Sequence, residues 1–391
     1  MRILTITHYA ELLGANRSLL HLVEGLRERG VEVQVWCPKE GAFTEKLSEL
    51  GISYRCFPFA NGAYSVRSVG FFSFFYKWRK TTCALAKFAA LAHDFRPDII
   101  HSNSSVVALG ALVAEKLDIP HVWHIREYGW LDYQLHFLVG QPFMRKYMQK
   151  AAAIIAISSS IRKHIQREYE FENLKNGKAI CEIYNGIGKQ QAIEKLGESL
   201  NSGSNKAGIL TFLIIGLLHP SKNQLQALRA FHLFYQKYTA NTAHLHPPKL
   251  QIIGGGRRDY EAQLRRYIQK NNLQNCVEMI GFVDEPAPYY QAASAVLMCS
   301  PNEAMGRVTA EAMAYRKPVI GYRGGATPEL ITPNENGFLY DGSDADLAEK
   351  MAVLASSETA FLERIAENAQ KTVLARFTDE VYTEQVWQVF N

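Results

Sequence analysis

Two carboxylates in the last third of the chain have a spacing suited to holding hydroxyl groups. Glu303 and Glu311 are eight positions apart, with Gly306, Arg307, Val308 and Thr309 between them. If Glu303 lies in the loop at the carboxyl end of a strand and Glu311 lies one turn into the helix that follows, their side chains converge. The amides and dipole of that first turn favour a phosphate. The pattern indicates a sugar-nucleotide site, and two solvated glutamates on a surface helix are the alternative.

The elements around these glutamates must position them. Apolar runs at 295–299 and 319–322 flank the pair, which is the plan of a βαβ unit. An earlier apolar run, 209–215, ends in Gly216 and leads to Lys222 at the start of a helical pattern. Lys222 is well placed there to bind a diphosphate, whereas taken by itself it would be read as an ordinary surface lysine.

Strand-like and helix-like segments alternate along the whole chain. This alternation over 391 residues predicts an α/β fold with two doubly wound Rossmann-like domains. We expect an N-terminal domain at 1–187, a polar linker at 188–208, a second domain at 209–370 and a helical segment at 371–391.

The first half of the chain has candidate site residues at the expected carboxyl ends of its strands. Gly14, Ala15 and Asn16 open the first helix, so their backbone could approach a phosphate or an acceptor. His124 and Arg126 follow another strand; a lone histidine there is structural as readily as functional. No GxGxxG motif is present, which argues against an NAD enzyme. No His or Cys spacing suggests a zinc site.

Composition limits the class of protein. A formal charge of +5 is too mild to indicate a nucleic-acid partner. The six cysteines form no CxxC pair, which favours reduced thiols and a cytoplasmic protein. The chain opens directly with a strand pattern, so no signal peptide is expected, and no apolar run approaches the ~20 residues of a membrane span.

The segment 64–90 is rich in aromatic and basic residues and contains no Asp or Glu. Aromatic and basic side chains together suit the inner face of a membrane with anionic lipid. The alternative is a long helix that packs its aromatics into the core, and stacking on nucleic acid is a more distant one. We therefore predict either a core helix or a peripheral membrane contact.

The whole chain resembles the retaining glycosyltransferases of the GT-B fold, specifically glycosyltransferase family 4, also called group 1. The second half carries the more specific motifs. They are the Glu-x7-Glu pair followed by Ala312 and Met313, a Gly-Gly with a later glutamate at 324–329, Asn185-Gly186 before the linker, and Lys222.

The resemblance implies that the domain at 1–187 binds the acceptor, that the domain at 209–370 binds the nucleotide sugar, and that a C-terminal helix at 371–391 crosses back to the first domain. It also implies a role for each matched residue. Glu311 would hold the ribose, Glu303 the donor sugar, and Lys222 with the amides of 306–309 the diphosphate. Gly216 would adjoin this site, Phe282 and Val283 would flank the base, and His124 would act near the transferred sugar. Members of the family need no metal, so no metal and no other cofactor is expected; the substrate would be a UDP-, GDP- or other nucleoside-diphosphate sugar.

Departures from the family pattern concern three positions. Ala15 stands where the first loop usually has a second glycine, Leu217 where many members have an arginine, and Gly188 where an aspartate is common. The expected function is retaining, metal-independent transfer of a hexose-type sugar to a glycan or lipid-linked acceptor in bacterial polysaccharide synthesis. A GT-B sugar-nucleotide epimerase and a non-catalytic GT-B partner protein are the alternatives.

Overall fold

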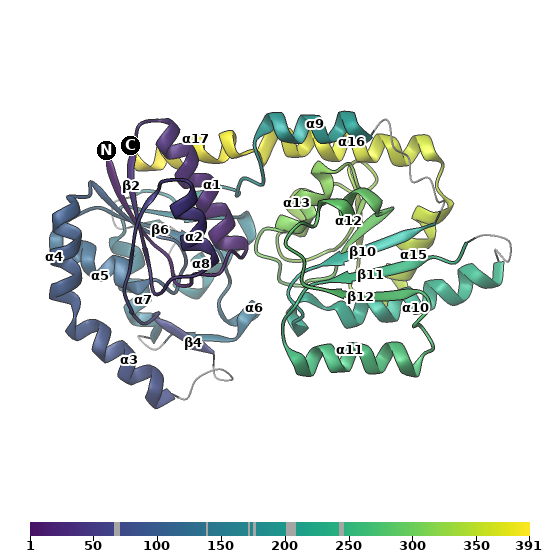
Figure 1. Cartoon of the computed structure of the whole chain (residues 1–391), viewed down its shortest axis with the longest axis horizontal. Coiled ribbons are helices and arrows are strands. Elements are labelled where there is room, and N and C mark those ends of the chain that lie inside the picture. The colour runs from purple at the N-terminus through teal and green to yellow at the C-terminus, as the bar shows by residue number, and fades with distance from the viewer. Residues whose placement is uncertain (66–70, 138–139, 171–172, 175–176, 201–208, 242–245) are drawn as a thin grey trace. The chain divides into compact units, whose positions relative to one another are not determined.

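The chain folds into two α/β units (Figure 1), in a computed structural model that describes residues 1–391 except 66–70, 138–139, 171–172, 175–176, 201–208 and 242–245. The first unit comprises Met1–Ile187 and Asp379–Asn391, and the second comprises Gly188–Thr378. Each contains a sheet of parallel strands, as the alternating sequence pattern predicted. The predicted fold class is confirmed.

The first unit is built on a seven-stranded sheet in the order β3-β2-β1-β5-β6-β8-β9. All pairings in it are parallel. β4 and β7 form a separate antiparallel pair. The strands of this unit are β1 (Arg2–Ile6), β2 (Glu32–Cys37), β3 (Ser53–Cys56), β4 (Ala63–Ser65), β5 (Ile99–Ser102), β6 (His121–Ile125), β7 (Leu135–Phe137), β8 (Ala153–Ala156) and β9 (Cys181–Glu182).

The second unit has a six-stranded parallel sheet in the order β12-β11-β10-β13-β14-β15. In both sheets the strand order reverses beside the first strand, and ligands of such sheets bind at that point. The strands are β10 (Thr211–Ile215), β11 (Lys249–Ile253), β12 (Val277–Gly281), β13 (Ala295–Met298), β14 (Val319–Tyr322) and β15 (Phe338–Tyr340).

Helices connect the strands in both units. The first unit contains α1 (Gly14–Glu28), α2 (Ala42–Glu49), α3 (Phe71–Cys83), α4 (Leu85–Phe95), α5 (Ala108–Leu117), α6 (Trp130–Tyr133), α7 (Gly140–Lys150), α8 (Ser159–Glu168) and α17 (Asp379–Phe390). The second contains α9 (Gln190–Leu200), the 3₁₀ turn η1 (Pro220–Lys222), α10 (Gln224–Asn241), α11 (Arg258–Lys270), α12 (Ala287–Ala292), α13 (Arg307–Ala314), α14 (Thr327–Leu330), α15 (Asp344–Ser356) and α16 (Thr359–Arg376).

The central strands are buried on both faces, because helices cover both sides of a parallel sheet. Every residue of β6, β8 and β13 is buried. The last helix, α17, adds Tyr382, Val386 and Phe390 to the core that α1 and the first sheet share. Figure 1 shows α17 in yellow beside α1, where it lies within the first unit.

Several element boundaries differ from the prediction. Residues 190–200 of the expected linker form α9, since Ile193 is buried and its carbonyl accepts a 2.9 Å hydrogen bond from Gln370 Nε2. The expected boundary at 370/371 falls inside α16, and the first unit resumes at Asp379 instead. The short strands β4, β7 and β15 were not predicted, because three residues give too little periodicity to detect.

The aromatic and basic segment forms α3 and much of α4. Phe75 and Tyr76 are 50% and 69% exposed, so these two aromatics do not pack into the core. Residues 66–70 and the side chains of 71–74 lie outside the described part of the chain. Among the helices that the structure describes, none combines the length and the apolar character needed to cross a bilayer.

Candidate nucleotide-sugar site

The reversal of strand order in the second unit brings two loops together. β10 and β13 are neighbours in the sheet, and η1 follows the first while the Glu303 loop follows the second. Ser300 Oγ donates a 3.0 Å hydrogen bond to Ser221 O, which ties the two loops at their bases. The switch point of this sheet therefore carries the predicted residues.

Lys222 and Glu303 form an ion pair across these loops. Lys222 Nζ lies 2.7 Å from Glu303 Oε2, and their side chains are 25% and 13% exposed. Partial burial reduces screening by water, so this pair interacts more strongly than a surface pair. The structure thus brings together two of the three predicted catalytic residues, which are 81 positions apart in sequence.

The first turn of α13 follows directly after the Glu303 loop. Gly306 is its N-cap with φ of +89°, a conformation that favours glycine, and no acidic side chain occupies the first turn. Intrahelical bonding begins when Ala310 N donates to Gly306 O at 3.0 Å. The preceding amides, those of Val308 and Thr309 among them, have no acceptor within the helix and can bind an anion.

Glu311 is held from two sides. Arg307 Nε donates to Glu311 Oε1 at 2.7 Å, and Tyr290 OH donates to Oε2 at 2.9 Å. Burial, together with the Glu311 charge, raises the pKa of Tyr290 well above its usual value, so the hydroxyl stays a donor. Sequence reasoning missed Tyr290, because one tyrosine on the short helix α12 has no distinguishing pattern.

The Gly324-Gly325 motif supports the Glu303 loop. Gly325 has φ of +57°, and a Cβ there would lie 2.6 Å from Glu303 N. Ala326 N donates a 2.8 Å hydrogen bond to Glu303 O. The close approach of two backbones, which only glycine permits, thus fixes the position of one of the paired glutamates.

Three further residues predicted to bind the donor directly follow strands of the same sheet: Gly216 follows β10, and Phe282 and Val283 follow β12. Gly216 follows β10 and meets Gly254 closely, since a Cβ on Gly254 would lie 1.9 Å from Gly216 O. Phe282, directly after β12, is 65% exposed, and Val283 is half-buried. An exposed aromatic ring can stack against a nucleobase, and this role of Phe282 stays a prediction.

In the first unit, Gly14 opens α1 beside open space, since nothing lies within 4 Å of the position that a Cβ would take there. Ala15 follows it half-buried. Asn16 is fully buried: it accepts from Thr7 Oγ1 at 2.6 Å and donates to Tyr9 O and Glu11 O at 2.9 Å. The Asn16 side chain therefore organises the loop, and only backbone remains for the predicted acceptor contact.

His124 and Arg126 lie together at the carboxyl end of β6. His124 is fully buried, and Arg126 is 6% exposed. Arg126 Nε donates to Asn103 Oδ1 at 2.6 Å, Nη2 donates to Tyr382 OH at 2.9 Å, and Nη1 donates to Asn185 Oδ1. Tyr382 was not predicted to contribute, because α17 reaches this group only through the tertiary fold.

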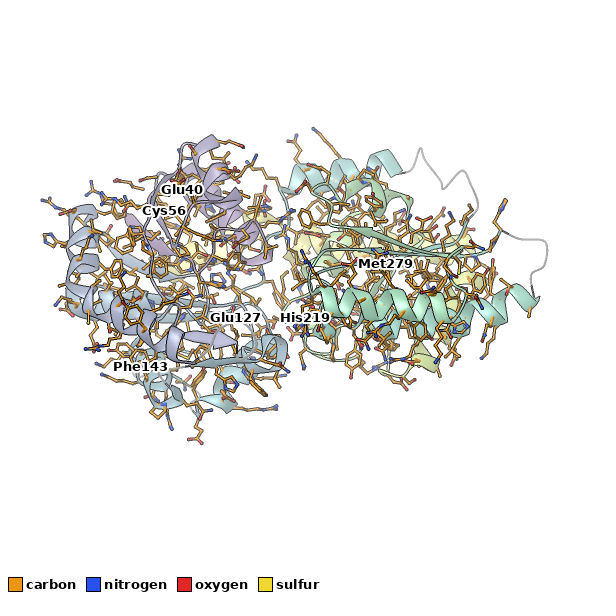
Figure 2. All side chains as sticks on the ribbon, turned by 60° about the horizontal axis from the view of Figure 1, so that its bottom comes forward. Glu40, Cys56, Glu127, Phe143, His219 and Met279 are labelled. Atoms are coloured by element: carbon orange, nitrogen blue, oxygen red, sulfur yellow. The ribbon has the colours of Figure 1, made fainter. Side chains whose placement is uncertain are left out.

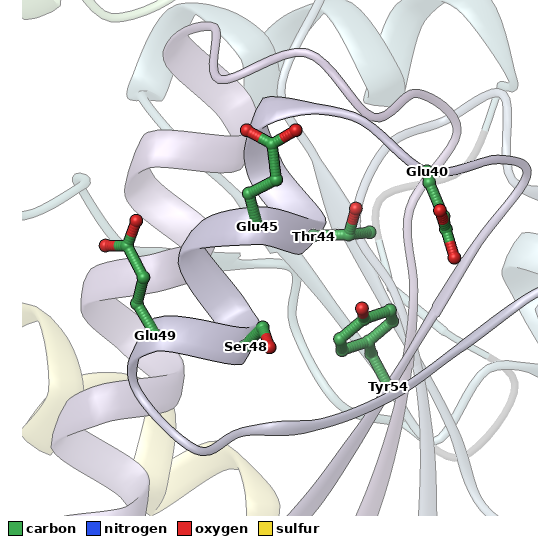
Figure 3. A pocket seen from close by; sticks show the side chains of 6 residues that line it. All are labelled: Glu40, Thr44, Glu45, Ser48, Glu49 and Tyr54. Carbon is green, nitrogen blue, oxygen red and sulfur yellow. The ribbon is translucent and has the colours of Figure 1, made fainter.

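A hollow of about 480 Å³ lies beside the edge strand β3 (Figure 3), but its chemistry does not suit a diphosphate. Its lining consists of Glu40, Thr44, Glu45, Ser48, Glu49 and Tyr54. Figure 2 shows Glu40 near Cys56, and burial together with this carboxylate raises the pKa of the Cys56 thiol. Three glutamates would repel a diphosphate, so this hollow is not the nucleotide site.

Comparison with known proteins agrees with this geometry. Residues 14–175 match the model of the glycosyl transferase 4-like domain, and residues 200–372 match that of glycosyl transferases group 1. Together the two matches take in most of the chain. The chain belongs to the group 1 glycosyltransferases, with the GT-B fold.

The chain is similar to several glycosyltransferases and to solved structures. An uncharacterized glycosyltransferase of Methanocaldococcus jannaschii is 28% identical over 67% of this chain and 66% of its own length. The alpha-monoglucosyldiacylglycerol synthase of Streptococcus pneumoniae is 26% identical over 72% and 64%. The alignments thus span slightly under two thirds of these relatives. Anabaena HepE, solved with UDP and glucose, is 22% identical with a TM-score of 0.77, covering 99% of this chain and 98% of that one.

Proposed function

We propose that the protein transfers a hexose-type sugar, with retention of anomeric configuration, from a nucleoside-diphosphate sugar to a glycan or lipid-linked acceptor. The observation that carries the proposal is the Lys222–Glu303 pair set against the open first turn of α13. A cation, helix amides and two carboxylates at one switch point match a diphosphate flanked by two sugars. UDP is the first nucleotide to test, since it is bound in the HepE structures.

The proposed chemistry is electrostatic. Negative charge grows on the β-phosphate as the nucleotide leaves, and prepositioned cations and amides stabilise it. Lys222 would exchange Glu303 for the phosphate, and the released carboxylate would then hold hydroxyls of the transferred sugar. The acceptor hydroxyl would attack from the face that the leaving nucleotide occupies, and the leaving phosphate would take its proton. This route needs no metal and no carboxylate that attacks the sugar to form a covalent intermediate.

A lipid-linked acceptor fits the surface of the first unit. Residues 50–93 contain no Asp or Glu, and neither do residues 133–167. The pairing of β4 with β7 joins these two stretches. Their exposed side chains include the aromatics Phe75 and Tyr76 and the cations Lys77, Arg79, Lys80 and Lys146. We infer a peripheral contact with anionic lipid, at the inner face of a bacterial membrane.

The test begins with thermal unfolding in the presence of nucleoside-diphosphate sugars. A true donor should raise the melting temperature, because a ligand at 100 times its Kd adds ~2.7 kcal/mol to stability. The Glu311→Gln variant should lose most of that rise. Glu349→Gln, an exposed glutamate on α15 of the same unit, is the matched control.

Product analysis completes the test. Mass spectrometry should detect a glycosylated acceptor, and NMR should show the donor's anomeric configuration in it. Nucleotide release without acceptor, accompanied by an isomerised sugar, would instead identify an epimerase. Binding without turnover across many acceptors would identify a non-catalytic protein, and no thermal response to any nucleotide would refute the site.

A further inference from the structure

Glu127 is a half-buried carboxylate without a cation partner, two residues beyond the end of β6 in the first unit. Among the described residues, no Lys, Arg or His forms an ion pair with it. The adjacent Arg126 donates its hydrogen bonds to Asn103, Asn185 and Tyr382 instead. Because taking a charge out of water costs free energy, such a carboxylate must be stabilised by hydrogen-bond donors.

The protein supplies these donors to one oxygen of Glu127. Oε1 accepts from Ser104 Oγ and from Ser105 N, both at 2.7 Å, and also from Ser105 Oγ. Ser104 is fully buried and Ser105 is 4% exposed. Trp123 Nε1 on β6 donates to Ser104 O at 2.8 Å and so fixes this loop. Three donors saturate Oε1 and hold the carboxylate against the loop that follows β5.

The second oxygen, Oε2, is left for another donor. No hydrogen bond from the described residues reaches it. Nor is it one of the fully buried side-chain atoms without a partner in that part of the chain. Oε2 is therefore open to solvent, on a side chain whose other oxygen is fixed. An ionised carboxylate only accepts hydrogen bonds, so a ligand at Oε2 must bring a donor.

The place of Glu127 in the sheet indicates which ligand this is. Ligands of parallel sheets bind beyond the carboxyl ends of the strands, where the strand order reverses. In the first sheet this point lies between β1 and β5, and Glu127 binds the loop after β5. Its negative charge would repel the phosphates of a nucleotide. A sugar, by contrast, offers hydroxyl donors, and their bonds to an ionised oxygen are stronger than those to a neutral one.

We propose that Glu127 binds a hydroxyl group of the acceptor sugar through Oε2, while Ser104 and Ser105 hold its carboxylate in position. The identity of this ligand rests on the proposed glycosyl transfer. The residue itself lies outside the nucleotide-sugar site, which belongs to the second unit. A failure of one proposal can therefore be told from a failure of the other.

Glu127→Gln separates ligand binding from support of the loop. Ser105 N can only donate, so the glutamine oxygen should replace Oε1 and keep the bonds to both serines. The glutamine amide then brings donors to the place of Oε2 and cannot accept from a hydroxyl. The melting temperature should consequently stay close to that of wild type.

Binding is measured by ligand-detected NMR on the full chain, with hexyl glucoside, hexyl galactoside and hexyl mannoside as probes of a lipid-linked sugar. At least one should bind wild type. Glu127→Gln should weaken that binding by about 10- to 100-fold, the scale of one hydrogen bond to a charged group. Ser105→Ala, which removes one of the three donors to Oε1, should weaken it by a smaller factor. Glu45→Gln, at an exposed position on α2 of the same unit, is the matched control and should bind like wild type.

Thermal stabilisation by UDP distinguishes this site from the nucleotide-sugar site. A Glu127→Gln variant that keeps the response to UDP but loses glycoside binding supports the proposal, whereas one that loses both responses overturns it. Equal glycoside binding by Glu127→Gln and wild type would also overturn it, since the carboxylate would then serve the loop alone. Absence of glycoside binding by wild type would overturn it whatever the variants do.

Discussion

The ammonium of Lys222 and the carboxylate of Glu303 neutralise each other at 2.7 Å, although they come from loops after two different strands. Each is therefore held in place by the group that a ligand would displace. The diphosphate of a donor would compete for the lysine, and its sugar would compete for the glutamate. Donor binding would therefore break this ion pair and give each of the two side chains a new partner.

Removing the cation should impair transfer more than folding. We expect Lys222→Gln to lower kcat by ~10²-fold, the usual scale for loss of one donor to developing negative charge. Lys222→Arg should fall between it and wild type, because the guanidinium keeps the charge in a different geometry. Steady-state kinetics measures both variants.

Lys249 provides the control for this substitution. It begins β11 at the opposite end of the sheet and pairs with Glu278 at 3.2 Å. Lys249→Gln should leave kcat unchanged. Comparable losses from Lys222→Gln and Lys249→Gln would show that charge in general, rather than the pair with Glu303, matters.

Gly325→Ala should displace Glu303. Its positive φ costs an alanine ~1–2 kcal/mol, and the added Cβ would collide with the Glu303 backbone. Turnover should therefore fall together with stability, as measured by denaturant unfolding and kinetics on the same preparation. Gly30→Ala, at φ of +76° with no neighbour within 4 Å, should lose only stability. Full activity in Gly325→Ala would contradict the supporting role.

Acid should destabilise the protein partly through His121. Burial lowers the pKa of this histidine from 6.5 to about 3. Between these values the unfolded chain binds a proton that the folded chain excludes, so stability falls as pH drops below 6.5. The contribution lost by pH 5 is ~2 kcal/mol, following the linkage relation for one proton.

Denaturant unfolding at several pH values measures this effect. His121→Gln should flatten the decline, since glutamine cannot titrate and can still contact Ser102, which lies 2.9 Å from His121 Nε2. His93→Gln, at an exposed position on α4, should keep the wild-type slope. Identical slopes in all three proteins would exclude His121 as a cause.

Charge reversal on α3 should weaken binding to anionic vesicles. Each cation near such a surface contributes ~1 kcal/mol, so changing Lys77, Arg79 and Lys80 to Glu should lower binding by at least ~100-fold. The same reversal at Arg265, Arg266 and Lys270, exposed on α11 of the second unit, controls for net charge. Co-sedimentation with vesicles distinguishes them, and equal losses in both triple variants would argue against α3 as the contact.

The sequence alone determined the fold class and the core of the candidate site. Buried parallel strands produce apolar runs that helical patterns separate, and Lys222, Glu303 and Glu311 follow such runs at the end where ligands bind. These signals are local, so one chain suffices to detect them. The roles assigned to these residues, and those assigned to Phe282, Val283 and the Gly14 loop, remain predictions.

Only the tertiary structure decided which distant groups meet these residues. Tyr290 reaches Glu311, Gly325 supports Glu303, and Tyr382 contacts Arg126 although 256 positions separate them. Such contacts depend on strand order and on how the returning helix α17 packs against the first unit, and neither leaves a periodic trace in the sequence.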